Sequence, residues 1–495
     1  MLLRRGLVRA LFVVLVVGTF PSVAAAQTTG APTSATAPTS GGLRWQPCRS
    51  GFECSTLTVP RDDAQPAGPT VDLALIRSPA RDQDRRIGSL LVNPGGPGGS
   101  AIDYVRYATH TLPAELRDRF DIVGVDPRGS GESDPVKCKY DMSKYYALDF
   151  SPDDQAERDA LVAGMQKFVD ACVASEGDYL RYISTDYTVR DLDKVRAALG
   201  DDRLTFLGYS YGTYIGAKYA AAFPDRVRAL VLDGAVDPSL DSKQMQVQQS
   251  AGFEDVLDGF LKWCTRESSC AFHRGGKVIP AFDALRARVD AEGLRVPGAR
   301  PARTLSPTEF DLGLGEILYE GAGGYSYLGE ALDAADRGDG AAMADLADSY
   351  TERSPDGSYG GIEDAFLAIS CADGPPVGTV ADVAEIEAAA AKVAPRTGPG
   401  IVNNSIACAL WPIPGAPAAP VSAPDAPPIV VVGTRHDPAT PFAWAQSLAR
   451  QLGSAVLISA PGAQHTSFGM GNRCVDDAVV RYLVDRTAPK RTLTC

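Results

Sequence analysis

The sequence predicts an α/β fold built on a largely parallel sheet, and three observations support this class. Continuous apolar runs bounded by glycine and proline, such as GSLLVNPGG (88–96) and FDIVGVDPRG (120–129), are typical of strands buried on both faces. Stretches with helical spacing separate such runs. The alternation stops near residue 237 and resumes near residue 427, so a module of another kind interrupts the sheet.

The first elements of the predicted sheet have alternating and β-branched character. CSTLTVP (54–60) and TVDLALIRSP (70–79) predict an antiparallel pair joined by a turn-rich stretch. AIDYVRYATHTLPAELRDR (101–119) can supply a crossover helix between the two buried strands. TVRDLDKVRAALG (188–200) has helical spacing and ends at a glycine. Residues 203–238 then predict a strand, a sharp turn, a helix and another strand.

A mostly helical module follows from residue 238 to residue 426. FEDVLDGFLKWC (253–264) and AEIEAAAAKVA (384–394) are helical stretches, and glycine and proline separate such stretches. The exit, PIPGAPAAPVSAPDAPP (412–428), predicts a proline-rich linker. We therefore expect a helical cap or lid inserted between core strands.

The buried-strand pattern resumes after this insertion. IVVVGTRHDPATP (429–441) and SAVLISAPGAQH (454–465) each begin as a buried strand, and CVDDAVVRYLVDR (474–486) predicts a closing amphipathic helix. The predicted core is thus divided between residues 43–237 and residues 427–495.

The first 26 residues have the pattern of a signal peptide. Three arginines precede the apolar run ALFVVLVVGTF and a small-residue cleavage site at 24–26. The run is about 11 residues long, short of the roughly 20 that span a bilayer, which argues against an uncleaved anchor. Residues 27–42 predict a flexible tether of small, polar and proline residues. We expect a protein secreted to the medium or the cell wall, without a stable membrane anchor.

The charge balance excludes some classes of partner. The chain has 48 lysines and arginines against 61 aspartates and glutamates, a formal net charge of -13. This excess of negative charge argues against nucleic acid and anionic membrane surfaces as partners. The sequence leaves the oligomeric state open, with a monomer as the default expectation.

Ten cysteines in a chain with a leader predict disulfides, because an oxidising compartment lets them persist. No CxxC pair and no Cys/His cluster with zinc spacing occurs, so we expect neither a metal nor a cofactor. Connectivity does not follow from sequence, and pairing between neighbours is a hypothesis. It would join Cys48 with Cys54, Cys138 with Cys172, Cys264 with Cys270, Cys371 with Cys408, and Cys474 with Cys495.

A serine stands between a predicted strand and a predicted helix, in the pentapeptide Gly208-Tyr209-Ser210-Tyr211-Gly212. The G-x-S-x-G spacing at such a junction is typical of a nucleophile held in a tight, strained turn. Chance matches to the pentapeptide alone are common, and the strand-turn-helix setting is what favours a nucleophile.

A serine nucleophile needs a base, and four histidines are present. His110 and His273 are better explained as surface or structural residues, whereas His465 follows a predicted strand near the chain's end. His436 also follows a strand, but its neighbour Asp437 has the better claim to that loop.

The order of Ser210, Asp437 and His465 along the chain is that of the catalytic triad of α/β-hydrolases. The alternative for Asp437 is an ordinary turn aspartate that caps the next helix.

The oxyanion formed during acyl transfer needs hydrogen-bond donors. The backbone N–H of Tyr211, next to the serine, is one candidate, and the N–H of Gly96 in NPGGPGGS (93–100) is the other. A phosphate cradle is the alternative for this glycine-rich stretch, but it has no GxGxxG register and no P-loop lysine. Asp126 and Arg128 more simply brace a neighbouring loop.

Five separated motifs together resemble one known group. NPGGPGGS, DPRGSGES, GYSYGTYIGAKYAAAFPDRVRALVLDGAVDP, AISCADG and VVVGTRHDPATP...GAQHTSFG are similar to the secreted actinobacterial tripeptidyl aminopeptidase family, α/β-hydrolases related to prolyl aminopeptidases. The resemblance spans nearly all of the chain after the leader and includes the family's C-terminal module.

The resemblance implies roles for individual residues. Ser210, Asp437 and His465 match the family's triad, while Tyr211 and Gly96 match its oxyanion donors. It also implies release of short peptides from free N-termini through an acyl-enzyme. Proline occupies position 94, where prolyl aminopeptidases usually have histidine, so proline specificity is not implied.

An exopeptidase must bind the substrate's α-amino group, and a buried carboxylate is the simplest way to do so. The insertion offers several acidic residues, of which Glu254 and Asp373 are the candidates we single out. The others are Asp255, Glu363 and Asp364.

Two other functions fit the same sequence. A secreted esterase or lipase would use the same triad with a different pocket. A cell-envelope binding protein on an inactive hydrolase scaffold is the non-enzymatic alternative, and the intact serine, acid and histidine argue against it. Peptides or proteins with free N-termini are the partners that a serine aminopeptidase would require.

Overall fold

The computed structural model describes residues 42–49, 51–300, 302–490 and 492–495. The predicted signal peptide (1–26) and the predicted tether (27–42), apart from residue 42, lie outside the described residues. Within the described ranges, no helix is both long and apolar enough to cross a membrane.

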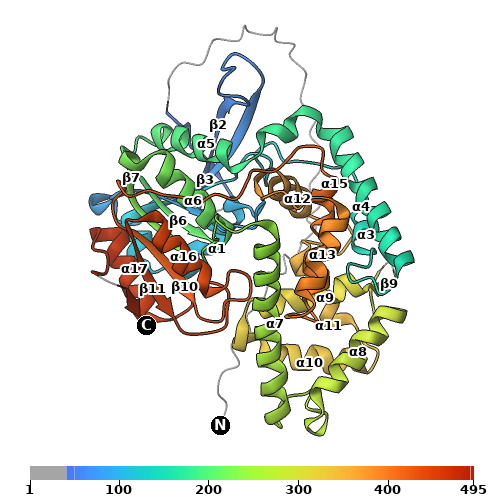
Figure 1. Cartoon of the computed structure of the whole chain (residues 1–495). Coiled ribbons are helices and arrows are strands. Elements are labelled where there is room, and N and C mark those ends of the chain that lie inside the picture. The colour runs from blue at the N-terminus through green and yellow to red at the C-terminus, as the bar shows by residue number, and fades with distance from the viewer. Residues whose placement is uncertain (1–41, 50, 301, 491) are drawn as a thin grey trace, which may run out of the picture. The chain divides into compact units, whose positions relative to one another are not determined.

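Residues 42–495 contain a ten-stranded mixed sheet. Most of this sheet lies on the left of Figure 1, beside a large group of helices on the right. The first strands pair antiparallel, as far as the contact between β3 and β5, and the pairs from β5 through β12 are parallel. The α/β class is therefore confirmed. In sheet order the strands are β1 (Gln46–Cys48), β2 (Phe52–Pro60), β3 (Thr70–Ser78), β5 (Phe120–Val125), β4 (Gly88–Asn93), β6 (Leu204–Tyr209), β7 (Val227–Asp233), β10 (Ile429–Thr434), β11 (Ala455–Ala460) and β12 (Leu493–Thr494).

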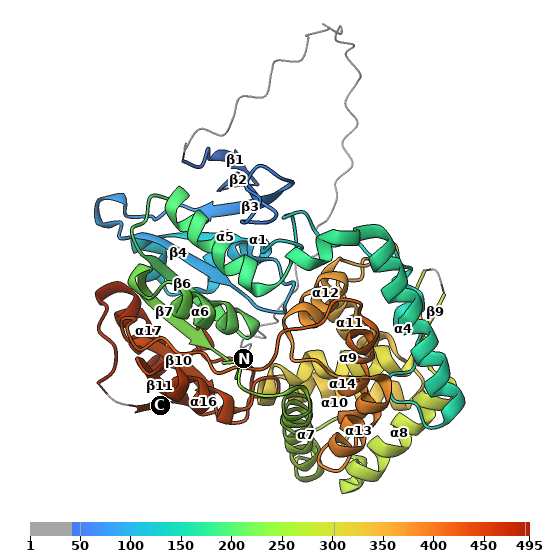
Figure 2. The ribbon, with the colours of Figure 1, turned by 45° about the horizontal axis from the view of Figure 1, so that its top comes forward.

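Helices cover both faces of the sheet. Successive residues of a central strand point to opposite faces, and in the central strands both sets are buried. Leu90 and Val92 of β4 pack in one group of buried residues with α1 and α17, whereas Leu91 packs in another with α5, α6 and α16. Figure 2 shows these helices around the sheet. The helices of these layers are α1 (Ala101–Thr111), α2 (Ala114–Arg119), α5 (Thr185–Ala198), α6 (Tyr211–Ala222), α16 (Phe442–Leu452) and α17 (Arg473–Asp485).

The predicted insertion between core strands is confirmed as a mostly helical segment between β7 and β10. Helices α7 to α11 enclose a hydrophobic group of their own. The elements are α7 (Ser242–Arg266), α8 (Val278–Glu292), β8 (Leu294–Val296), β9 (Arg303–Leu305), α9 (Pro307–Leu318), α10 (Tyr325–Asp336), α11 (Ala341–Tyr350), α12 (Ile362–Asp373), α13 (Val380–Ala390), α14 (Gly398–Asn403) and α15 (Ile406–Leu410). Short 3-10 turns lie at Gln83–Arg85, Gly177–Tyr182, Pro224–Arg226, Arg274–Gly276 and Gly321–Gly324.

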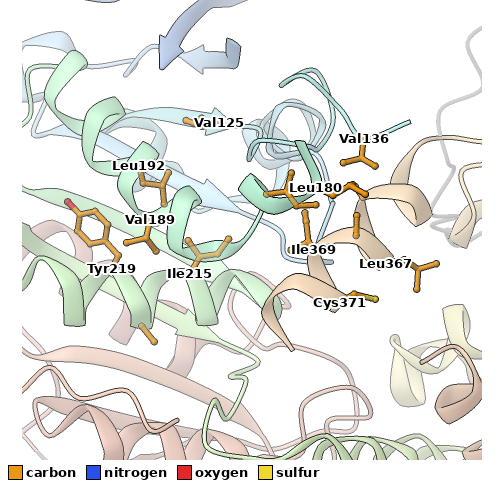
Figure 3. Packing of buried hydrophobic residues seen from close by; sticks show 14 of the residues in the cluster. Val125, Val136, Leu180, Val189, Leu192, Ile215, Tyr219, Leu367, Ile369 and Cys371 are labelled. Atoms are coloured by element: carbon orange, nitrogen blue, oxygen red, sulfur yellow. The ribbon is translucent and has the colours of Figure 1, made fainter. Parts of the chain in front are cut away.

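Helix α12 shares a hydrophobic core with the layer that covers the sheet. Figure 3 shows Val189 of α5 and Ile215 of α6 in the same cluster as Leu180 and, from α12, Ile369 and Cys371. Because protein interiors are close-packed, this continuity fixes α12 relative to the sheet.

Two parts of the chain between the first strands and α5 differ from the sequence-based expectation. Pro113 divides the predicted crossover helix into α1 and α2, because proline lacks an N–H and disfavours a helical conformation in the preceding residue. The segment before α5, for which we predicted no element, forms α3 (Met142–Tyr146) and α4 (Gln155–Glu176). Helix α4 packs against α15 of the insertion.

Five disulfides join the ten cysteines, each pairing neighbours along the sequence. They connect Cys48 with Cys54, Cys138 with Cys172, Cys264 with Cys270, Cys371 with Cys408, and Cys474 with Cys495. The fourth ties α12 to α15, and the fifth ties α17 to the residue that follows the last strand. Such cross-links stabilise a fold chiefly by restricting the unfolded chain.

The loop after β5 is braced by buried charges. The Asp126 carboxylate accepts hydrogen bonds from the N–H of Ile102 (3.0 Å) and of Glu132 (2.8 Å). The Arg128 guanidinium binds Asp191 at 2.6 and 2.9 Å, and both side chains are buried. These contacts hold the loop against the start of α1 and against α5.

Loss of the Arg128 guanidinium should destabilise the fold. Arg128→Met leaves Asp191 buried with only Lys194 at 3.2 Å, and we expect the free energy of unfolding to fall by about 3 kcal/mol. Urea denaturation followed by circular dichroism measures this change. Arg181→Met is the matched control, because its ion pair with Asp178 is exposed and should contribute little. Equal destabilisation by the two substitutions would contradict the buried brace.

Candidate active site

Ser210 lies at the sharp junction between β6 and α6. Its backbone has φ 52° and ψ -124°, a strained conformation for a residue with a side chain. The Ser210 N–H donates a hydrogen bond to the carbonyl oxygen of Asp233 on the neighbouring strand (2.9 Å). A Cβ on Gly208 would lie 2.4 Å from the carbonyl oxygen of Gly212, so the turn requires glycine there.

Asp437 and His465 come from the loops that follow β10 and β11. His465 Nδ1 lies 2.8 Å from Oδ1 and 3.0 Å from Oδ2 of Asp437. The Asp437 carboxylate is buried and also accepts the backbone N–H groups of Ala439 (3.0 Å) and Thr440 (2.9 Å). A satisfied, buried carboxylate of this kind fixes the imidazole's orientation and tautomer.

The imidazole is further held by the insertion. The backbone N–H of His465 donates to the carbonyl oxygen of Tyr319 (2.9 Å), and the Tyr319 ring packs edge-on against the imidazole with 5.3 Å between centroids. Burial lowers the pKa of His465, but the charge and hydrogen bond of Asp437 outweigh it, so the pKa is raised overall.

Ser210 and His465 line the same cavity. His465 Nε2 is buried, and within the described part of the chain it has no hydrogen-bond partner. A Cβ on Gly234, which follows Asp233, would lie 2.9 Å from His465 Cε1. Since the carbonyl oxygen of Asp233 also accepts the backbone N–H of Ser210, the imidazole and the serine both adjoin the segment Asp233–Gly234. No hydrogen bond joins Nε2 to the serine hydroxyl, and such bonds often tighten only when substrate binds.

Asp233 is a buried residue of the candidate site that was not predicted from the sequence. Its Oδ2 accepts the N–H groups of Ser467 (2.9 Å) and Phe468 (2.7 Å), which directly follow the His465 loop. Burial raises its pKa to about 6. The only sequence signal was an aspartate ending the buried strand VRALVLD, a place where a hydrophobic residue is more usual.

The backbone N–H groups of Tyr211 and Gly96 are the donors that we predicted for an oxyanion site. Tyr211 is the first residue of α6, so its N–H has no acceptor within that helix. A Cβ on Gly95 would lie 2.9 Å from the Tyr211 nitrogen, so the glycine-rich loop packs directly on the turn. The Gly95 N–H donates a hydrogen bond to Asn93 Oδ1 (3.0 Å), whereas the Gly96 N–H donates to no acceptor among the described residues.

The cavity has a volume of about 900 Å³ and lies between the sheet's carboxyl edge and the insertion. Helices α7, α9 and α12 line it, together with residues 414–418 of the proline-rich stretch, which we predicted only as a linker. Its acidic lining residues are Asp311, Glu316, Glu352, Glu363 and Asp373.

The two predicted amine-binding residues have different surroundings. Asp373 lines the cavity, but its oxygens accept the Thr185 N–H (2.8 and 2.9 Å) and the Tyr211 hydroxyl. Burial raises the pKa of Asp373 to about 6. Glu254 is not among the lining residues, because its carboxylate binds Arg396 and Thr397. These contacts give Glu254 a structural role in joining α7 to the start of α14.

The remaining histidines do not line the cavity. His110 is exposed on α1, His273 Nδ1 contacts the carbonyl oxygen of Cys264 (2.8 Å), and exposed His436 contacts Asp255 (2.8 Å). The described ranges contain no group of histidine, cysteine, aspartate or glutamate residues suited to hold a metal ion.

Comparisons with known proteins agree with the fold of this chain. Residues 88–272 match the family described as alpha/beta hydrolase fold, and residues 394–495 match the family described as TAP-like protein. Serine protease Hip1 of Mycobacterium tuberculosis is 38% identical over 92% of this chain and 91% of the relative. Carboxylesterase B of the same species is 37% identical, over 95% and 92% respectively. Tripeptidyl aminopeptidase of Streptomyces lividans is 28% identical, over 94% and 89%.

The pH dependence of turnover should show the effect of the Asp437 charge on the pKa of His465. Because His465 must be neutral to accept a proton, kcat/KM should rise with pH, with its midpoint above about 6.5. Asp437→Asn removes the charge that raises the pKa of His465 and leaves burial, which lowers it. The midpoint should then fall below that of the wild type, and kcat should fall by about 10,000-fold.

A pH–rate profile with a p-nitrophenyl ester measures both effects. Thermal unfolding of Asp437→Asn serves as the control for folding. An unshifted midpoint in a folded variant would contradict the assigned pairing of Asp437 and His465.

Proposed function

Because the chain belongs to the actinobacterial α/β-hydrolase family that includes serine protease Hip1 and the tripeptidyl aminopeptidases, we propose that it is a secreted serine aminopeptidase. It would release tripeptides or dipeptides from free N-termini. The observation that carries this proposal is a single cavity that contains Ser210 and His465 and is bounded by the helical insertion and buried carboxylates.

In the proposed reaction, the Ser210 hydroxyl attacks the scissile carbonyl while His465 Nε2 takes its proton. The Tyr211 and Gly96 N–H groups stabilise the negative charge on the carbonyl oxygen. His465 then returns the proton to the departing amine, and the acyl-enzyme forms. Water, deprotonated by His465, hydrolyses this ester and restores the serine. Asp437 keeps the proton on Nδ1 throughout.

The shape and charge of the cavity favour an exopeptidase. Helices of the insertion line the cavity that contains Ser210, so its walls suit the end of a short peptide better than a folded protein. Three extended residues span roughly 10 Å, a length that the cavity accommodates. The acidic lining suits the positive charge of a free N-terminus better than it suits a neutral acyl chain.

Secretion is supported by two features. The predicted signal peptide would direct export, and five disulfides are expected only where an oxidising compartment maintains them. The protein would remain in the medium or at the cell wall.

An esterase is the second candidate, because one relative bears the name Carboxylesterase B and the same triad cleaves esters. The inactive binding scaffold has less support, since Ser210, His465, Tyr211 and Gly96 line one cavity and Asp437 contacts His465.

Substrate comparison tests the proposal. We expect Ala-Ala-Ala-p-nitroanilide to be cleaved with a kcat/KM at least about tenfold higher than its N-acetyl form, because acetylation removes the charge that the acidic cavity attracts. Equal turnover of both peptides would favour an endopeptidase, and cleavage of p-nitrophenyl butyrate alone would favour an esterase.

Ser210→Ala tests the nucleophile. The substitution should lower kcat by at least about 10,000-fold and abolish labelling by a fluorophosphonate probe, because no hydroxyl remains to be acylated. Ser370→Ala is the matched control, since this second serine also lines the cavity but its hydroxyl makes no hydrogen bond to a histidine of the described chain. Retained labelling of folded Ser210→Ala would contradict the role of Ser210.

A further inference from the structure

A buried carboxylate in the cavity wall has no cationic partner. Glu363 lies in the first turn of α12, is 8% exposed and lines the cavity. The Tyr145 hydroxyl lies 3.1 Å from Glu363 Oε1 and 2.6 Å from Asn404 Oδ1. Tyr145 and Asn404 also line the cavity. No lysine or arginine of the described chain forms a salt bridge with Glu363.

The hydrogen bonds of this cluster are incomplete. The Tyr145 hydroxyl has one proton, and two acceptor oxygens compete for it. Burial raises the pKa of Glu363 to about 7, although hydrogen bonds from Tyr145 and Asn404 oppose the shift. A ligand that brings several N–H donors and a positive charge would donate to both Glu363 Oε1 and Asn404 Oδ1. Its charge would also stabilise the Glu363 carboxylate. A primary ammonium group has these properties, with three donors.

Other carboxylates of the cavity have partners or, like Glu352, are exposed. Asp311 binds the Arg286 guanidinium at 2.7 Å, and Asp373 accepts a backbone N–H and a phenol. Glu316 accepts a serine hydroxyl and is only half-buried. Glu363 is therefore the buried carboxylate whose charge is least compensated.

The position of Glu363 is tied to the oxyanion loop. A Cβ on Gly98 would lie 3.1 Å from both the Ile362 oxygen and the Phe366 nitrogen, so this loop packs on the first turns of α12. The same loop packs on Ser210 through Gly95. A single packed loop thus contacts both the proposed nucleophile and the start of α12, and it sets the separation between Ser210 and Glu363.

We propose that Glu363, with Tyr145 and Asn404, forms the subsite that binds the α-ammonium group of the peptide substrate. This inference rests on the proposed aminopeptidase function. The ammonium group donates hydrogen bonds to the Glu363 carboxylate and to Asn404 Oδ1. Because the separation from Ser210 is fixed, the anchored amine determines how many residues precede the cleaved bond.

Glu363→Gln tests the subsite because it removes the charge and keeps the shape. The measured quantity is kcat/KM for Ala-Ala-Ala-p-nitroanilide divided by kcat/KM for its N-acetyl form. We expect this ratio to fall about 10- to 100-fold, mainly through a higher KM for the free peptide. Turnover of p-nitrophenyl butyrate by the same preparation reports whether the Ser210 machinery is intact. A ratio equal to that of the wild type would overturn the inference.

Glu316→Gln is the matched comparison, because it removes a carboxylate from another part of the same cavity wall. An equal fall in the ratio would mean that the general negative potential attracts the amine, and it would overturn the specific subsite. Glu363→Asp keeps the charge and should lower the ratio less than Glu363→Gln does. If Glu363→Gln does not fold, a wild-type ratio in Glu363→Asp, whose carboxylate is withdrawn by one methylene, would overturn the subsite.

Failure of the proposed function has a different signature. A wild-type enzyme that cleaves both peptides equally, or cleaves only the ester, would refute the aminopeptidase and the subsite together. A wild type that prefers the free peptide and keeps this preference in Glu363→Gln would refute the subsite alone.

Discussion

The packed turn at Ser210 is the constraint on which the rest of the site depends. A residue with a side chain and φ of 52° is costly, by about 1 to 3 kcal/mol, and persists only where its surroundings fix it. Here β7 fixes it through the Asp233 carbonyl, and the glycine-rich loop packs on it through Gly95. The serine hydroxyl, the Tyr211 N–H and the Gly96 N–H therefore owe their relative positions to one backbone arrangement.

Two buried aspartates, Asp437 and Asp233, hold His465 through different contacts. Asp437 contacts the imidazole itself, and its remaining capacity is satisfied by backbone N–H groups. Asp233 holds the backbone just after His465, through Ser467 and Phe468. The first therefore controls the tautomer and pKa of the imidazole, whereas the second controls where the loop lies. Such supporting contacts keep a catalytic group within the narrow geometry that proton transfer needs.

Helix α12 links the insertion to the chemistry of the core. Its 12 residues extend for about 18 Å along the cavity. Its first turns, which include Glu363, pack against the glycine-rich loop at Gly98, and Asp373 at its end binds the Tyr211 hydroxyl. Shared hydrophobic packing and the Cys371–Cys408 disulfide hold this helix in place. The insertion thus contributes to the wall of the site as well as covering it.

The sequence by itself determined the α/β class, the helical insertion and the candidates Ser210, Asp437 and His465, because each depends on periodicity or a short motif at a strand end. Only the tertiary structure separated Glu254, tied to Arg396, from acidic residues that reach the cavity. It alone revealed Asp233 and the Tyr145–Glu363 contact, which joins residues 218 positions apart. Local patterns encode which face of an element is buried, but the partner that a buried polar side chain meets there is decided by how distant segments pack.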